Sequence, residues 1–141
     1  MEKFSKPTII TIPKIADPRG NLSVIQQNDT VPFPIARVFY LYDVPADSSR
    51  GGHAHHRDNQ FMIAMAGSFD VVLDNGREKR RYTLNRPYQG LLIPPGFWRT
   101  MDNFSAGSVC VVITDNPYDE SDYIREYEEF VATSDPETHP F

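Results

Sequence analysis

Short segments in which apolar and polar residues alternate follow one another along most of the chain. Each segment has the length of a β-strand, and alternation with period two is typical of a strand with one buried face. The pattern predicts eight strands, at residues 8–12, 22–26, 36–42, 60–66, 69–73, 79–84, 90–93 and 108–114. Eight short strands at close spacing indicate an all-β sandwich or barrel.

Residues that favour tight turns separate these segments. Asp17-Pro18-Arg19-Gly20, Asp74-Asn75-Gly76 and Pro94-Pro95-Gly96 each end in a glycine, which tolerates a positive φ. The strongest hairpin signal is Asp74-Asn75-Gly76, because it stands between the segments 69–73 and 80–84. We expect those two segments to pair as antiparallel neighbours.

The period changes to about 3.6 residues only in the stretch DESDYIREYEEFVA, residues 119–132. Its apolar stripe consists of Tyr123, Ile124, Tyr127, Phe130 and Val131. We expect one terminal helix, whose first amides Asp119 or Ser121 can cap. Residues 133–141 have little apolar surface to bury, so the chain is predicted to form a single domain at 1–132 with a flexible tail.

The composition fits an all-β domain with one core. The chain has 141 residues, of which 40% are hydrophobic and 12% aromatic, with 12 prolines and 8 glycines. A chain of this length buries roughly two-thirds of the surface that its unfolded form exposes. The net charge of -5 and the pI near 5.3 argue against a nucleic-acid or membrane partner, because phosphate surfaces are bound by an excess of lysine and arginine.

A single cysteine, Cys110, stands in the apolar segment 109–113. One cysteine cannot form an intrachain disulfide, so a reduced, buried thiol in a reducing compartment is expected. The first residues lack the apolar segment of a secretion signal, and no apolar stretch reaches the roughly 18 residues of a membrane span. These features predict a cytoplasmic protein.

The stretch RGGHAHHRDNQ, residues 50–60, is the first candidate for chemistry. Because side chains alternate along a strand, His53 and His55 project from the same face and converge on one spot. Imidazole is a common metal ligand, and it is also the side chain that exchanges protons most readily near pH 7. The pair therefore suggests a metal site or an acid/base site, and in a third interpretation both rings only satisfy hydrogen bonds in the core.

The spacing around the histidines matches the first cupin motif, in which H-x-H is followed by a glutamate and, after six residues, by a glycine. Gln60 and Gly67 occupy those two positions. The second motif, P-x-G, two residues, H, three residues, N, matches residues 94–103, with Arg99 at the histidine position. The chain therefore resembles a cupin, a β-sandwich of the jelly-roll type that is also called a double-stranded β-helix.

Two departures from the cupin ligand set argue against a metal. Metallocupins hold their ion with two histidines and a glutamate from the first motif and a histidine from the second. Gln60 offers a neutral amide in place of the carboxylate, and Arg99 is a permanent cation that repels a divalent ion. We therefore expect no metal and no other cofactor, and we favour acid/base chemistry by the imidazoles.

Several arginines suit an anionic substrate, and the candidates to surround the imidazoles are Arg19, Arg37, Arg50 and Arg99. In a metal-free pocket a neutral imidazole can take the proton next to a carbonyl while cations stabilise the enediolate. Guanidinium groups also bind a diphosphate, which suggests a sugar nucleotide, although each arginine alone is equally consistent with a solvated surface charge. Tyr40 can orient a sugar hydroxyl or simply pack, because only one of Phe39 and Tyr40 can point into a barrel.

A longer set of matches makes the resemblance more specific. Residues 17–22, 31–40, 50–55 and 118–127 read DPRGNL, VPFPIARVFY, RGGHAH and YDESDYIREY. Further matches along the chain are Asn75-Gly76, Gly90-Leu91, Trp98, Met101 and Phe104-Ser105. Through nearly its whole length the chain resembles the dTDP-4-keto-6-deoxyglucose 3,4-ketoisomerases, also called WxcM-like sugar 3,4-ketoisomerases.

The resemblance implies a metal-independent isomerase that acts on a dTDP-linked keto-deoxy sugar. Such an enzyme moves the keto group of the 6-deoxyhexose from C4 to C3, a step that feeds the synthesis of 3-amino-3,6-dideoxy sugars for surface glycans. By the same resemblance His53 is the general base, and His55 is its proton relay or orienting partner. Family members are homodimers that exchange N-terminal strands, so part of each pocket is expected to come from the partner.

The substrate-binding residues that this interpretation implies are Arg19, Arg37, Tyr40, Arg50, Trp98 and Arg99. Arg99 stands where family members commonly have a histidine; it can strengthen oxyanion or phosphate binding, or indicate another sugar or stereochemical route. The Arg19-Gly20 pair lies where members differ, and it favours a galacto over a gluco product. Two other functions stay open: a sugar-nucleotide 3- or 5-epimerisation, and a catalytically silent cupin that binds a sugar nucleotide.

Overall fold

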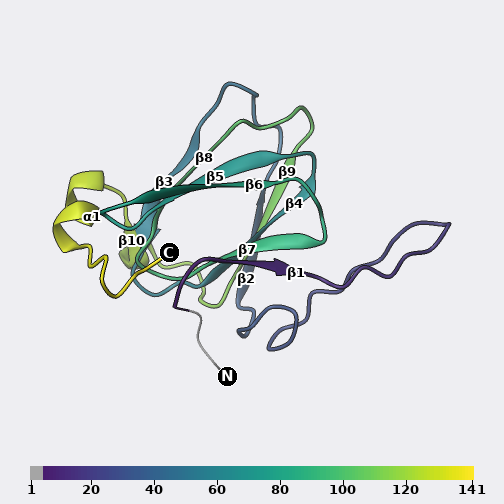
Figure 1. Ribbon diagram of the computed structural model, residues 1–141, viewed down its shortest axis with the longest axis horizontal. Coiled ribbons are helices and arrows are strands. Elements are labelled where there is room, and N and C mark those ends of the chain that lie inside the picture. The colour runs from purple at the N-terminus through teal and green to yellow at the C-terminus, as the bar shows by residue number, and fades with distance from the viewer. Residues whose placement is uncertain (1–4) are drawn as a thin grey trace.

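The structure of the protein is a computed structural model that describes residues 5–141, and most of its regular structure is antiparallel β-strand. Among these residues the strands are β1 (Thr8–Thr11), β2 (Arg37–Leu41), β3 (Arg50–His55), β4 (Gln60–Ala66), β5 (Phe69–Asp74), β6 (Lys79–Leu84), β7 (Gln89–Ile93), β8 (Trp98–Asp102), β9 (Val109–Thr114) and β10 (Tyr123–Ile124). They form two five-stranded sheets, with the orders β1-β7-β4-β9-β2 and β10-β3-β8-β5-β6. Figure 1 shows β5 and β6 above β1 and β7, with the core between them. The expected all-β sandwich is confirmed.

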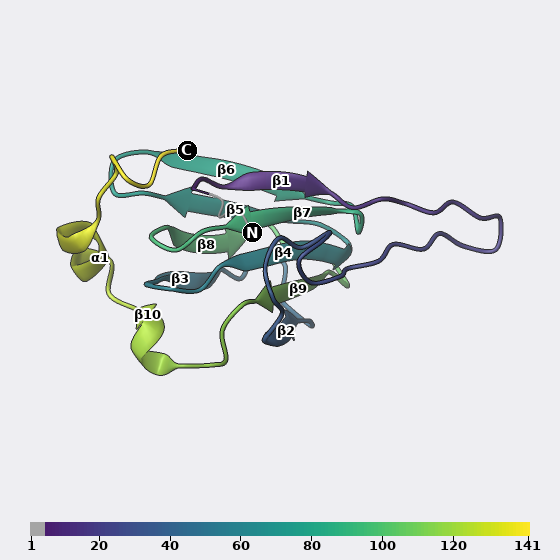
Figure 2. The ribbon, with the colours of Figure 1, turned by 90° about the horizontal axis from the view of Figure 1, so that it is seen from below.

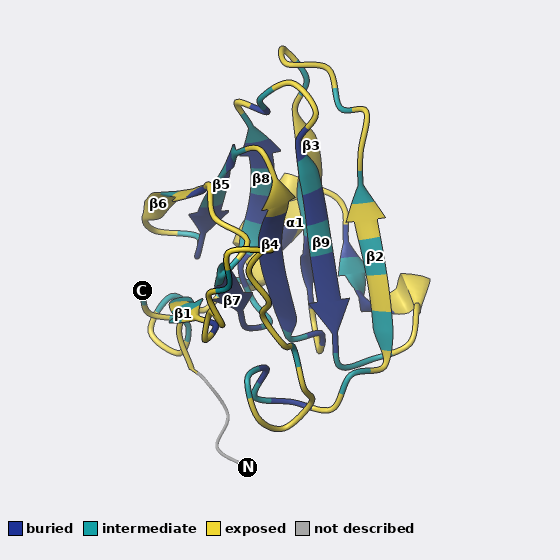
Figure 3. Ribbon diagram, turned by 90° about the vertical axis from the view of Figure 1, so that its right-hand side faces the viewer, coloured by how far each residue is buried: buried dark blue, intermediate teal, exposed yellow. Residues whose placement is uncertain are grey.

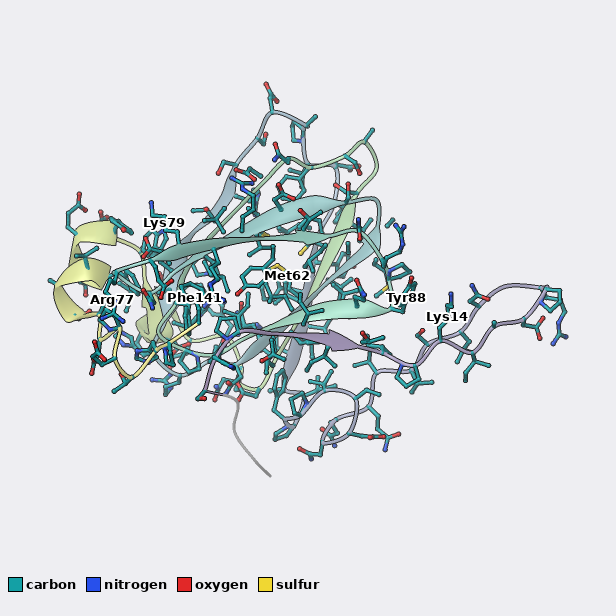
Figure 4. All side chains as sticks on the ribbon, in the orientation of Figure 1. Lys14, Met62, Arg77, Lys79, Tyr88 and Phe141 are labelled. Carbon is teal, nitrogen blue, oxygen red and sulfur yellow. The ribbon has the colours of Figure 1, made fainter. Side chains whose placement is uncertain are left out.

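The main core fills the space between the two sheets. Alternation along β5 places Phe69, Val71 and Leu73 on its buried inner face. Met62 enters the same core from β4, and its side chain lies between the sheets in Figure 4. Cys110 of β9 lies there too, and burial raises the pKa of its thiol to about 12, which agrees with the expected inert thiol.

Strand β4 is buried on both faces, as the dark central strands of Figure 3 show. Its outer residues Phe61 and Ile63 pack against Ile12, Val31 and Phe33, which come from the segment between β1 and β2. This cover explains why β4 reads as a nearly continuous apolar run, a pattern typical of strands with no solvated face.

Seven of the eight predicted strands are present, and the hairpin at Asp74-Asn75-Gly76 is confirmed by the pairing of β5 with β6. The prediction of a strand at residues 22–26 is wrong. Residues 13–24 instead form a long arm that extends away from the sandwich in Figures 1 and 2. The arm is closed by a single bridge between Ile15 and Leu22. Its apolar side chains Ile15, Leu22 and Val24 are about half exposed, so their alternation finds no burying partner among residues 5–141.

The C-terminal stretch does not form the single helix that its periodicity predicts. It forms a short 3-10 helix (Glu120–Asp122), then β10, then α1 (Tyr127–Thr133). Asp119 caps the 3-10 helix by accepting the Ser121 N–H, as expected for a cap in this region. The helical pattern is interrupted because β10 pairs with the end of β3, where its two residues Tyr123 and Ile124 lie opposite His55 and Ala54.

The last residues are docked on the sandwich, in contrast to the flexible tail that the sequence predicts. Phe141 packs against the main core and against Phe97, and Figure 4 shows it close to the barrel. The carbonyl of His139 accepts a hydrogen bond from the Asn75 side chain at 2.9 Å. These contacts, together with an ion pair between Glu137 and Arg77, hold a segment whose overall composition is polar. No helix in residues 5–141 has the length and apolar character that a membrane crossing requires.

Candidate active site

A bulge in β3 sets the direction of the first histidine. The register of β3 against β8 shifts between Gly51 and His53, and Gly51 and Gly52 have φ values of 91° and 75°. Only glycine adopts such φ values readily, and a Cβ at Gly51 would meet the Arg99 carbonyl oxygen at 2.9 Å. The bulge brings His53 opposite Arg99. Glycine-rich sequence before the histidines therefore has a local structural purpose.

His53 and His55 lie together on the inner face of this sheet, as the H-x-H pattern predicts. Their ring centroids are 4.9 Å apart, and the rings meet edge to face. Tyr123 of β10 packs against both rings, with centroid distances of 5.2 Å to His53 and 4.4 Å to His55. The two rings differ in exposure, because His55 is fully buried and His53 is only partly buried.

A buried chain of hydrogen bonds runs through His55. The Asp122 Oδ2 atom lies 2.9 Å from its Nδ1, and the Gln60 Nε2 atom lies 3.2 Å from its Nε2. Arg99 Nη1 donates to Gln60 Oε1 at 2.8 Å, and Arg99 Nη2 donates to the Phe97 carbonyl at 3.0 Å. Asp122, His55, Gln60 and Arg99 are all buried. In contrast, no side chain among residues 5–141 forms a hydrogen bond with the His53 ring.

A second buried carboxylate adjoins this chain. Asp58 Oδ2 lies 3.7 Å from His55 Nδ1 and 3.4 Å from an Arg37 nitrogen, while its other oxygen has no partner among residues 5–141. Burial raises the pKa of Asp58, and the nearby Asp122 raises it further. The arginines Arg37 and Arg99 thus face the carboxyl groups Asp58 and Asp122 around one imidazole.

Both imidazoles are neutral at ordinary pH. Burial lowers the pKa of His53 to about 3, and the charge of Arg99 contributes in the same direction. Burial and the same guanidinium lower the pKa of His55 to about 2, although the Asp122 carboxylate beside it favours the charged ring. The pKa of Arg99 itself falls to about 10 through burial, so the guanidinium remains a cation. The site therefore presents neutral bases beside a buried positive charge.

A group of residues that sequence reasoning missed covers the imidazoles on the solvent side. The Arg125 guanidinium stacks on the Tyr123 ring at 4.3 Å, and it donates to the Glu120 carboxylate at 2.6 and 2.9 Å. Tyr118 also donates to Glu120. All of these residues except Tyr118 belong to the stretch 119–132, for which the sequence predicts a helix. The signal that could have found them is the string YDESDYIREY, which carried the resemblance but received no role.

The structure brings only some of the predicted substrate-binding residues together. Arg37 and Arg99 lie beside His55 through the contacts above, and Arg50 lies exposed at the start of β3. Trp98 occupies the opposite face of β8, where it packs against Tyr127 and Phe130 of α1. Its contacts in this chain are those of a packing residue.

Two other predicted binding residues lie away from the imidazoles. Tyr40 is 59% exposed on the outer face of β2, while Phe39 packs toward the main core. Arg19 lies in the arm, where it forms an exposed ion pair with Asp17 at 2.9 Å. Within one chain neither residue contacts the histidine pair.

The group of His55, Asp58 and Asp122 is the one candidate metal cluster among the described residues, with ligand atoms within 4.8 Å of one another. Two of its members are already engaged, because Asp122 accepts the Arg57 and Asp58 backbone N–H groups and faces His55 Nδ1. His53 does not belong to this group. An ion would have to replace these hydrogen bonds, so the donor set fits a proton network better than a metal.

Comparison with known proteins gives a consistent result for the sequence. A family model described as "FdtA: WxcM-like, C-terminal" matches residues 5–135. A protein of Aneurinibacillus thermoaerophilus, named TDP-4-oxo-6-deoxy-alpha-D-glucose-3,4-oxoisomerase, is 40% identical over 122 residues, which are 86% of this chain and 88% of that protein.

Solved structures of similar proteins superpose over most of the chain. QdtA, a sugar 3,4-ketoisomerase of Thermoanaerobacterium thermosaccharolyticum in complex with TDP, has a TM-score of 0.89 and 37% identity, and the match covers 91% of this chain and 93% of that one. A histidine-to-asparagine mutant of the same enzyme was solved with TDP-4-keto-6-deoxyglucose. WlaRB, a TDP-quinovose 3,4-ketoisomerase of Campylobacter jejuni, has a TM-score of 0.86 and 40% identity, covering 90% and 98% of the two chains.

Proposed function

The chain belongs to the FdtA family of WxcM-like proteins, and we propose that it is a 3,4-ketoisomerase that acts on a TDP-linked 4-keto-6-deoxy sugar. The relatives that support this proposal match most of both chains and share the same reaction in their names. In this reaction the keto group moves from C4 to C3 of the sugar ring. The observation in this chain that carries the proposal is a neutral, partly exposed imidazole, His53, set beside a buried guanidinium.

The geometry suits proton transfer through an enediolate. His53 takes the proton from C3, the electron pair of that bond forms a C3–C4 double bond, and the C4 carbonyl oxygen becomes an oxyanion. The C3 hydroxyl passes its proton to the C4 oxyanion and becomes the new ketone, while the imidazolium returns its proton to C4, so C4 ends as a hydroxyl-bearing carbon and no atoms are gained or lost. Arg99 supplies a fixed positive charge near the developing oxyanion, and its burial keeps that charge out of water.

Substrate binding is assigned to the remaining predicted residues in two groups. Arg37 and Arg50 are placed to hold the diphosphate of the bound nucleotide in the same chain. Arg19 and Tyr40 do not contact the histidine pair in their own chain, and we assign them to the pocket of a second subunit in a homodimer that exchanges N-terminal strands. The extended arm supports this assignment, since its apolar side chains Ile15, Leu22 and Val24 are about half exposed.

The product defines the next step by its chemistry. A 3-keto-6-deoxy sugar linked to TDP is the substrate that an aminotransferase needs to make a 3-amino-3,6-dideoxy sugar. We therefore place the reaction before such a transamination, in the synthesis of surface glycans. Arg19-Gly20 favours the galacto configuration at C4 of the product.

The test is incubation of the purified protein with TDP-4-keto-6-deoxyglucose and a chelator, followed by proton NMR of the sugar ring in deuterated water. We expect a 3-keto product with deuterium at C4, and the splitting between H4 and H5 after a parallel reaction in ordinary water gives its configuration. His53→Asn should lower turnover by about 10³-fold while TDP affinity is kept, because the amide preserves the shape but cannot accept the proton. Exchange at C5 would indicate an epimerase instead, and binding without any exchange would indicate a silent cupin.

A further inference from the structure

We propose that Asp122 is a positioning residue for this isomerisation: with Gln60 it holds the buried His55 ring in one neutral tautomer, protonated on Nδ1, and leaves His53 to exchange protons with the substrate. The inference rests on the proposed ketoisomerase function. Its structural part, the tautomer, can be measured without any substrate.

The donor and the acceptor of each hydrogen bond can be assigned by starting from Arg99. A guanidinium only donates, so the Gln60 atom that lies 2.8 Å from Arg99 must be the amide oxygen. The Gln60 amide nitrogen then faces His55 at 3.2 Å, and an amide NH₂ group also only donates. Nε2 of His55 must therefore accept this bond, and it carries no proton.

The carboxylate end selects the same tautomer. Asp122 Oδ1 accepts the Arg57 N–H at 2.6 Å, and its Oδ2 accepts the Asp58 N–H at 3.3 Å. The same Oδ2 faces His55 Nδ1 at 2.9 Å. An ionised carboxylate can accept all of these bonds, whereas a protonated one would turn an O–H toward another donor. Nδ1 of His55 therefore donates, and both ends of the chain agree.

This arrangement uses both nitrogens of His55. Nδ1 gives its proton to Asp122 and Nε2 receives one from Gln60, so a proton taken from the substrate would have to displace a buried bond. Full burial of the ring, which the structure also shows, removes it from direct contact with a ligand in solution. Of the two roles that the sequence left open, these contacts favour the orienting partner over the proton relay.

The state of His55 affects His53 because the two rings meet edge to face at 4.9 Å. His53 must become an imidazolium for a moment when it holds the substrate proton. A positive charge on His55 would disfavour that imidazolium, since like charges this close repel in a buried site. The neutral tautomer that Asp122 enforces avoids the repulsion.

The substitution Asp122→Asn keeps the shape of the side chain but breaks the order of donors and acceptors around His55. If its amide nitrogen faces His55, Nδ1 must accept and Nε2 must carry the proton, which then meets the NH₂ group of Gln60. If the amide nitrogen faces the other way, it meets the Arg57 N–H. A comparable aspartate-to-asparagine change in the serine-protease triad lowers kcat by about 10⁴ through the wrong histidine tautomer.

The test compares nitrogen-15 NMR spectra of the imidazoles in the wild-type protein, Asp122→Asn and the matched control Asp119→Asn. Asp119 caps the same 3-10 helix but touches neither histidine. We expect His55 to be protonated on Nδ1 alone in the wild type and the control, and to lose this single form in Asp122→Asn. For TDP-4-keto-6-deoxyglucose, kcat should fall about 10²-fold in Asp122→Asn and stay within about twofold in the control. TDP affinity should change by less than about twofold in both.

A wild-type His55 that carries its proton on Nε2, or a folded Asp122→Asn with unchanged kcat, overturns the proposal. If Asp122→Asn does not fold, Gln60→Glu replaces it, because a carboxylate keeps the bond from Arg99 but cannot donate to Nε2. An unchanged kcat there also overturns the proposal. Absence of turnover by the wild type overturns the proposed function and leaves the measured tautomer intact, so the two failures are distinguishable.

Discussion

The surroundings of His55 and the N-terminal arm differ in how their polar groups are paired. Around His55, Arg99 and Asp122 come from distant parts of the sequence, are buried, and meet through hydrogen bonds that run in one direction. In the arm, Arg19 pairs with Asp17 two residues away, and its side chain is exposed. The polar groups around His55 are thus paired within one chain, whereas those of the arm are exposed and available to the second subunit that we propose.

The largest expected effect is on the free energy of unfolding, when one arginine in each region is replaced by methionine. Arg99→Met removes the buried guanidinium and leaves Gln60 Oε1, Asp58 and Asp122 without its charge, so the free energy of unfolding should fall by about 3–5 kcal/mol. Arg19→Met removes an exposed charge, and we expect no measurable change in stability. Urea unfolding at pH 7 measures both. Equal losses for the two variants would contradict the contrast between the regions.

The sequence predicted most of the sandwich because two-faced strands leave a clear period. It failed at residues 22–26 and 119–132, where the pattern is also periodic but the partner surface decides the outcome. Leu22 and Val24 alternate as strand residues do, yet each is about half exposed and belongs to no strand of residues 5–141. Tyr123 and Ile124 fit a helical stripe, yet they pair with β3 instead. Local periodicity cannot reveal which neighbour an apolar face will meet.

The candidate site was predictable to a similar extent. Alternation along one strand was enough to place His53 and His55 together, and motif spacing drew attention to Gln60 and Arg99. Asp122 was missed because it lies 67 residues from His55. It reaches the site because the two-residue strand β10, which follows it, pairs with β3, and no local rule predicts that pairing. Contacts between distant segments depend on the assembled fold.

The second prediction concerns pH and again separates the two regions. The ordinary pKa of histidine is 6.5, and burial lowers that of His55 to about 2, so below pH 6.5 the unfolded chain binds a proton that the native chain does not. Stability is therefore complete above this pH and is lost as the pH falls, at about 1.4 kcal/mol per pH unit for one such group. His53 adds a smaller loss because it is partly exposed, while the raised pKa of Asp58 acts in the opposite direction nearer the carboxyl range.

Urea unfolding between about pH 7 and pH 5.5 measures this loss where only the histidines contribute. The matched control is Asp17→Asn in the arm. This carboxyl group is exposed, and its pKa lies below the pH range in which the histidines titrate. We expect the control to show the same slope as the wild type. A stability that does not change over this range would mean that the imidazoles are solvated in the native protein.

The smallest expected effect tests whether the arm completes a second subunit's pocket. Arg19→Met should lower kcat/KM for the TDP-linked sugar by about tenfold, the cost of one charge-assisted hydrogen bond, and should leave the His55 tautomer unchanged. His53→Asn removes the base and leaves the arm intact. Each variant alone is defective, for reasons that lie in different regions of the molecule.

Mixing the two variants as unfolded chains and refolding them together distinguishes the two possible origins of Arg19. If the pocket combines Arg19 of one subunit with His53 of the other, half of the dimers are mixed and each has one intact site, so about a quarter of the wild-type activity returns. If each pocket uses its own chain's arm, no site is intact. The mixture then keeps only the residual activity of its Arg19→Met half, about a twentieth of the wild-type value, because the tenfold loss applies to half of the chains. Kinetics at low substrate concentration separate a quarter from a twentieth, and the lower value would assign Arg19 to the pocket of its own chain.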